Sequence, residues 1–192
     1  QGLHATIVEC NTAYPGARTN DKDHSELARE HGFTAIAPFH LLDSVASTAL
    51  PVVDGKHINY ALIGKDWLDY NFTIVLSHFK GHPMAGFGGA LKNMGIGIQS
   101  REGKAWVHSA GKHDDPNKLW GDGMPAQDDF LETMAEAAKA RGVATVHCQT
   151  AAEVLQYLRQ FVRPGDAVLA KASHAMGLEQ LLQDFYKELP QG

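Results

Sequence analysis

The stretch 72–79, FTIVLSHF, constrains the fold more than any other part of the chain. Its apolar and β-branched residues follow one another without the alternation seen in a strand that faces water on one side. Such a run is typical of a strand buried on both faces, as in a parallel sheet covered by helices. We therefore predict an α/β fold with a mostly parallel sheet flanked by helices.

Shorter segments on the N-terminal side fit this fold class. Residues 5–10 (ATIVEC) and 34–39 (TAIAPF) are predicted strands. The segment 23–33 between them predicts a helix, which Asp23 would cap at its start and Gly32 would end. Strand-like and helix-like segments thus alternate, as expected for an α/β protein.

The middle of the chain adds a β-hairpin and a long polar loop. Residues 50–64 alternate around Asp54-Gly55, a pair typical of a tight hairpin turn. A helix is expected to begin within 86–98. Residues 101–127 are rich in Gly, Pro, Asp and His and predict a loop or lid, and 128–140 predict a helix with acidic residues in its first turn.

The C-terminal part predicts a βαβα unit with parallel strands and a right-handed crossover. Its expected elements are a strand at 143–148, a helix at 151–162, a strand at 167–172 and a helix at 177–189.

Composition limits the classes of function. A net charge of −5 makes a broad nucleic-acid surface unexpected. The two cysteines are far apart in the sequence, so we expect neither a disulfide framework nor a four-cysteine metal site. No apolar run is long enough for a bilayer, so we expect no membrane partner and a cytoplasmic location.

The segment 76–97 holds two histidines, two lysines and six glycines, which predicts a ligand site. Backbone N–H groups of a glycine-rich turn cradle anions, and lysines add positive charge. The alternatives are a tight packing turn for the glycines and loop hydrogen bonding for the histidines. The residues proposed to bind the anion are Gly86, Gly88, Gly89, Lys92 and Asn93. Those proposed for acid–base chemistry are His78, Lys80 and His82, and those for a divalent metal are His78, His82 and His108.

A second set of polar residues follows the first predicted strand, at the end where open α/β sheets carry their sites. Asn11 and Arg18 are the candidates there, since a guanidinium binds carboxylate or phosphate in two places. Arg101 and Lys104 begin the polar loop and would bring charge over an anionic ligand. The plain alternative for each is a surface or loop residue.

Three stretches resemble a prokaryotic family known as a domain of unknown function: 9–36, 54–104 and 127–140. The block SHFKGH…GFGGALKN is the most specific part. Many members of that family carry ferredoxin-like inserts with 4Fe-4S clusters. Because the ferredoxin cysteines are missing here, we expect no intrinsic iron–sulfur cluster. The cluster-bearing relatives suggest an electron-transfer partner, and a homo-oligomer is the alternative.

After residue 140 the resemblance changes. The stretch 161–182 is similar to the C-terminal end of the Mur ligase that adds D-alanyl-D-alanine, but the phosphate-binding motif G-x-x-x-x-G-K-[ST] is absent. We therefore expect a 1–140 domain and a 141–192 segment that completes its sheet, joined as a natural or engineered chimera.

The expected function is binding of a small anionic molecule, with or without a divalent metal, at the glycine-rich segment. Two alternatives stay open. One is a chimeric fold without catalytic activity, and the other, which the missing motif disfavours, is a fragment of an ATP-dependent peptide ligase.

Overall fold

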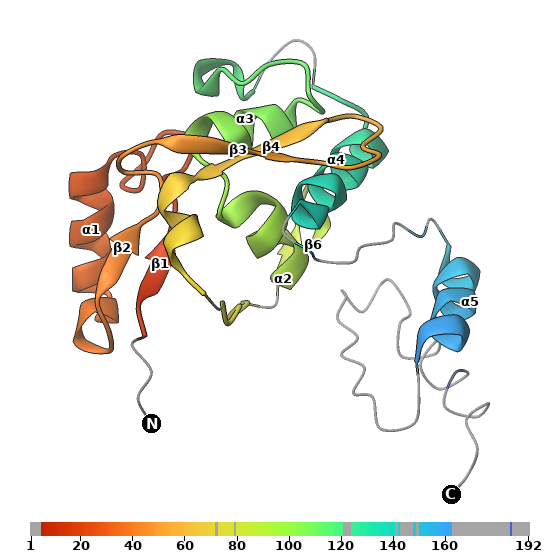
Figure 1. Ribbon diagram of the computed structural model, residues 1–192, viewed down its shortest axis with the longest axis horizontal. Coiled ribbons are helices and arrows are strands. Elements are labelled where there is room, and N and C mark those ends of the chain that lie inside the picture. Colours follow the sequence, from red (N-terminus) through yellow and green to blue (C-terminus); the bar gives the residue numbers. More distant parts are fainter. Residues whose placement is uncertain are drawn as a thin grey trace, which may run out of the picture.

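The computed structural model describes most of the N-terminal three quarters of the chain and one helix beyond it (Figure 1). The residues described are 5–71, 73–78, 80–120, 124–140, 142, 148, 150–162 and 185.

The first unit is a parallel strand pair with a helix between its strands. Strand β1 (Ile7–Glu9) pairs with β2 (Phe39–Leu41), and α1 (Asp21–Glu30) packs beside them (Figure 1). The strand expected at 34–39 is mostly wrong, because residues 33–35 form the short helix η1 (Phe33–Ala35) and β2 begins only at Phe39.

Helix α1 starts and ends close to the predicted residues. Its N-cap is Asn20, whose Oδ1 accepts from the backbone N–H of Asp23 at 3.0 Å. The prediction that Asp23 caps the helix was therefore wrong by three positions. Gly32 follows the helix at φ 80°, the left-handed conformation that favours glycine, so the predicted end is confirmed.

The predicted hairpin is confirmed. Strand β3 (Ser47–Pro51) pairs antiparallel with β4 (Tyr60–Gly64), and Asp54 takes a positive φ of 54° in the connection. That connection is eight residues long, at 52–59, rather than a two-residue turn. Glu136 stabilises it by accepting hydrogen bonds from the backbone N–H groups of residues 56–58, at 2.8 to 3.3 Å.

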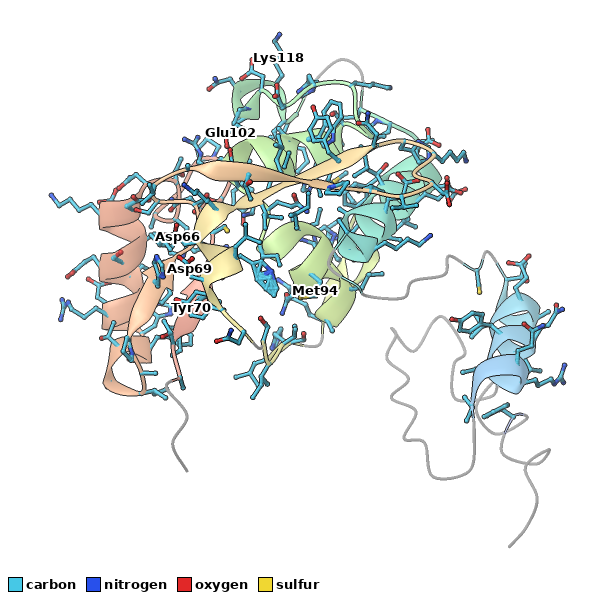
Figure 2. All side chains as sticks on the ribbon, in the orientation of Figure 1. Asp66, Asp69, Tyr70, Met94, Glu102 and Lys118 are labelled. Carbon is cyan, nitrogen blue, oxygen red and sulfur yellow. The ribbon has the colours of Figure 1, made fainter. Side chains whose placement is uncertain are left out.

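A short helix, η2 (Lys65–Asp69), follows the hairpin and is tied to the first unit. His40 of β2 lies between the Tyr70 hydroxyl, 2.8 Å from Nδ1, and the Asp66 carboxylate, 2.9 Å from Nε2. Asp66 and Tyr70 are labelled in Figure 2. These two bonds connect the hairpin region to the parallel pair.

The strand predicted at 72–79 is wrong. Residues 73–78 have no regular structure, and Ile74 and Leu76 are 73% and 87% exposed. Val75 packs against the protein core, and the Leu76 carbonyl accepts from Asn93 Nδ2 at 3.3 Å. In this apolar run, Val75 therefore contacts the core, whereas Ile74 and Leu76 on either side of it face solvent.

The glycine-rich segment forms a small hairpin and a helical turn. Strand β5 (Lys80–His82) pairs antiparallel with β6 (Gly86–Gly88). Then follow α2 (Ala90–Lys92) and η3 (Asn93–Gly97), a single turn of π-helix. The helix expected to begin within 86–98 is thus confirmed. Gly86 has φ 63°, so a backbone requirement of the hairpin explains this glycine.

Three more helices complete the described fold, with a short turn η4 (Pro116–Lys118): α3 (Arg101–His108), α4 (Gln127–Lys139) and α5 (Ala151–Phe161). Helix α4 confirms the prediction at 128–140. The loop predicted from residue 101 is wrong over α3, which Ser100 caps by accepting from the Gly103 N–H at 3.2 Å. Lys104 and His108 lie on its buried face, which hides the apolar period of the helix.

Helix α5 confirms the prediction at 151–162, and Thr150 and Glu153 form a capping box at its start. Except for Cys148 and Phe185, the strands expected at 143–148 and 167–172 and the helix expected at 177–189 lie outside the described residues. No helix in the described ranges is both long and apolar enough to cross a membrane.

The fold is a small mixed α/β fold rather than a mostly parallel sheet. Over the described ranges the strands form three two-stranded sheets, and one of these is parallel. Helices α3 and α4 pack on the β3–β4 hairpin around a core that includes Phe130, Ile58 and Val107 (Figure 1). Met94 of η3, labelled in Figure 2, belongs to a second cluster with Cys10 and Leu42. The glycine-rich segment is therefore anchored between two apolar clusters.

Candidate functional site

A cavity of about 400 Å³ lies where the end of β1, the β5–β6 hairpin, the η3 turn and α3 meet. It brings together ten of the residues proposed from the sequence: Arg18, His78, Lys80, His82, Gly88, Gly89, Lys92, Asn93, Lys104 and His108. These residues come from three separate parts of the chain, the loop after β1, residues 78–93 and helix α3, so the cavity is formed only by the folded protein.

Three proposed residues do not line the cavity. Asn11 is buried in a structural network, with His24 Nδ1 3.1 Å from its side-chain oxygen and its backbone N–H donating to Asp43. Gly86 lies in the β5–β6 hairpin, outside the residues that line the cavity. Arg101 Nε donates to the carbonyl of Thr12, a residue of the cavity wall, at 3.2 Å.

Positive charge dominates the cavity wall. Arg18, Lys80, Lys92 and Lys104 line it, against the single carboxylate of Glu9. Burial lowers the pKa of Lys92 below its usual value, and the neighbouring cations, Lys80 first among them, lower it further. The four cations therefore repel one another, and an anion among them would relieve that repulsion.

Lys104 has a structural role as well as a charge. Its Nζ donates to the carbonyls of Gln99 at 2.6 Å and Gly97 at 3.1 Å, at the end of η3. Burial lowers its pKa, and the negative charges of Asp43 and Glu9 act in the opposite direction. Two of the three ammonium hydrogens are thus committed to the protein, which leaves one for a ligand.

Cys10 lines the same cavity but is not an activated nucleophile. Burial raises the pKa of its thiol to about 12 and outweighs the nearby Lys104 charge. A thiol with this pKa stays protonated near neutral pH.

The ring of His82 is held by its own hairpin turn. Its Nδ1 accepts hydrogen bonds from the backbone N–H groups of Met84 at 3.3 Å and Ala85 at 3.1 Å. Burial lowers the pKa of His82, and Lys92 and Lys80 lower it further. Because Nδ1 is an acceptor, the proton of the neutral ring is on Nε2, so His82 offers a ligand a hydrogen-bond donor.

His108 has the opposite arrangement. Its Nδ1 lies 2.6 Å from the carbonyl oxygen of Lys104, which can only accept, so Nδ1 carries the proton. The ring packs against Phe130, with a centroid distance of 5.0 Å, and meets Trp120 edge-on at 5.9 Å. Burial is the main cause that lowers the pKa of His108 to about 4. The neutral ring therefore offers a ligand an unprotonated Nε2.

His78, His82 and His108, the three histidines proposed to bind a metal, do not form a group with ligand atoms within 4.8 Å of one another. In the part of the chain that the structure describes, the only group of His, Cys, Asp or Glu with three ligand atoms within 4.8 Å of one another is His57, Asp129 and Glu132. That group lies outside the cavity, and Lys56 Nζ already contacts Glu132 Oε2 at 2.7 Å. His57 Nε2 is 2.7 Å from the same oxygen. It is thus an ion-pair cluster between the hairpin connection and α4.

Several residues of the cavity wall were not selected from the sequence. Glu9, Thr12, Leu119 and Trp120 line it. Glu9 sits at the end of a predicted strand, which was a usable signal. Leu119 and Trp120 lie in a segment expected to be loop, and nothing in their sequence context places them near His108.

Comparisons with known proteins identify a family for the chain. A family model described as Domain of unknown function (DUF362) matches residues 1–176. The match extends past residue 140, where we expected the family resemblance to stop. Nothing in the comparisons supports the predicted Mur ligase segment or a chimera. Comparison with curated proteins and with solved structures found no match. The chain belongs to the family Domain of unknown function (DUF362).

Proposed function

We propose that this protein binds a small anionic molecule in the cavity beside the glycine-rich segment. The observation that carries the proposal is the charge of the wall: Arg18, Lys80, Lys92 and Lys104 meet around about 400 Å³, with Glu9 as the carboxylate among them. A chain with net charge −5 has concentrated cations at this one place. Cavities of this size accommodate small-molecule ligands.

The cations differ in how far they are already satisfied. Arg18 donates to the Tyr14 hydroxyl at 3.0 Å, and Lys104 donates to two carbonyls. Within the described ranges, no carboxylate forms an ion pair with Lys80 or Lys92. These two lysines are therefore the strongest candidates for direct contact with the anion. Lys80 is exposed, whereas Lys92 is half-buried, which makes its charge more effective than it would be in water.

The geometry favours anion binding over a metal held by the histidines. A metal ligand needs an unprotonated ring nitrogen, and in His82 that nitrogen, Nδ1, already accepts two backbone hydrogen bonds. His82 would have to leave its hairpin turn to bind a metal. As a donor to an anion it can stay where it is.

The role of Lys80 and Lys92 can be tested by replacing both with methionine. Calorimetric titration with pyrophosphate should show binding to the unchanged protein and a loss of roughly 100-fold or more in the double variant, since each charge-assisted hydrogen bond contributes about 1.5–3 kcal/mol. The affinity of the unchanged protein should fall as salt is added. Lys22→Met, at an exposed position of α1, is the control and should bind normally.

Folding of the double variant is expected to be intact, because removing two of four repelling cations lowers repulsion in the empty cavity. Its melting temperature should therefore equal or exceed that of the unchanged protein. Undiminished pyrophosphate affinity in a folded double variant would refute the proposal.

A further inference from the structure

We infer that the ligand is an oxyanion that carries a proton of its own next to the negative charge, such as a hydrogen phosphate or a hydroxycarboxylate. This inference rests on the anion-binding function proposed above and narrows the class of ligand. It follows from the hydrogen bonds that fix the rings of His82 and His108 in opposite tautomers, with the proton on Nε2 in His82 and on Nδ1 in His108.

The donors of the cavity account for the negative charge. Lys80, Lys92 and the Nε2–H of His82 all present hydrogens, so they complement oxygens that only accept. A fully ionised oxyanion would satisfy this side of the cavity. Donors alone would not distinguish one oxyanion from another.

The acceptors of the cavity need a different partner. His108 presents a lone pair at Nε2, and among the residues that the structure describes none is hydrogen-bonded to that atom. Glu9 adds a carboxylate to the same wall. A proton-free oxyanion placed there would bring its own lone pairs against these acceptors, whereas a ligand O–H would donate to one of them.

A ligand does not easily change the tautomer or the protonation of His108. Turning the ring over would leave the Lys104 carbonyl without its 2.6 Å bond and would disturb the packing on Phe130. Protonating Nε2 would place another positive charge near Lys92, Lys104 and His82, in a buried position. The ligand is thus expected to supply the proton.

Sulfate and hydrogen phosphate test this directly, because they have similar size and the same charge at about pH 8 but only hydrogen phosphate has an O–H. An unpaired acceptor costs about 1–3 kcal/mol, so the protein should bind phosphate roughly 10- to 100-fold more tightly than sulfate. Glycolate against methoxyacetate makes the same comparison for a hydroxycarboxylate. The pair that binds more tightly shows whether the cavity binds a phosphate-like or a hydroxycarboxylate ligand.

The variant His108→Gln should lose most of the preference within the pair that binds, because an amide side chain can donate as well as accept. His31→Gln, at an exposed position after α1, should keep it. Melting curves of both variants establish that they are folded.

Equal affinity for phosphate and sulfate, and for glycolate and methoxyacetate, would overturn the inference and leave anion binding standing. A preference that survives in folded His108→Gln would also overturn it. If pyrophosphate binds the unchanged protein but none of the four anions does, the inference alone is contradicted. If pyrophosphate and the four anions all fail to bind, the proposed function is contradicted as well.

Discussion

Replacing Gly103 with alanine is expected to destabilise the protein by about 3 kcal/mol or more, or to prevent folding. A Cβ at this position would lie 1.9 Å from the carbonyl oxygen of Leu62 and 2.8 Å from Gln99 Oε1. The first of these atoms belongs to the backbone of β4 and cannot rotate away. Helix α3 would have to move off the hairpin.

A second effect adds to the loss of stability in Gly103→Ala. The Leu62 carbonyl also accepts from the backbone N–H of Ser100 at 3.0 Å, and Ser100 caps α3. Movement of the helix therefore strains its own cap. Because alanine is intrinsically better than glycine in a helix by about 1 kcal/mol, any measured loss understates the steric effect.

Gly81→Ala is the matched control, since a Cβ there has no atom within 4 Å. Urea unfolding followed by circular dichroism should place the Gly103 variant far below the unchanged protein and the Gly81 variant within about 0.5 kcal/mol of it. Equal midpoints for the two variants would contradict the close packing of α3 on β4.

Acidification should remove a large part of the stability between about pH 6.5 and pH 4. His24 and His108 are both buried, and burial is the main cause that lowers the pKa of each to about 4. An unfolded histidine titrates near 6.5, so within this window the unfolded chain binds more protons than the folded one. The unfolding free energy then falls as the pH falls, by on the order of 2–3 kcal/mol for each histidine across the window.

Urea midpoints measured at several pH values test this. The variant His24→Gln keeps a polar side chain beside Asn11 and should lose about one proton, or roughly 1.4 kcal/mol per pH unit, from the slope near pH 5.5. Carboxylates titrate in the same range, but they are common to both proteins and cancel in the comparison. Parallel curves for His24→Gln and the unchanged protein would show that His24 is not held neutral.

Local sequence patterns predicted the elements whose apolar face matches their helical or strand period. The acidic start and alanine-rich body of 128–140 predicted α4, and the alternation around Asp54 predicted the hairpin. The run at 72–79 failed because apolar content was taken as burial, whereas Ile74 and Leu76 face solvent. Helix α3 was missed for the opposite reason, since polar Lys104 and His108 occupy its buried face.

The site was partly predictable for a related reason. Ends of strands and glycine-rich turns are where open α/β folds place ligands, and this rule selected Arg18 and Lys92. It could not reveal the roles of His82 and His108, which depend on a turn two residues away and on a helix carbonyl. Hydrogen bonds of this kind become visible only when the chain is folded.

The most direct test of the central claim is a crystal structure of the protein soaked in arsenate, located by anomalous scattering. Arsenate has the size, charge and proton of hydrogen phosphate. We expect an arsenic peak inside the cavity, with arsenate oxygens within hydrogen-bonding distance of Lys92 Nζ and of the Nε2 atoms of His82 and His108. An empty cavity at saturating arsenate, or arsenic bound only elsewhere on the surface, would contradict it.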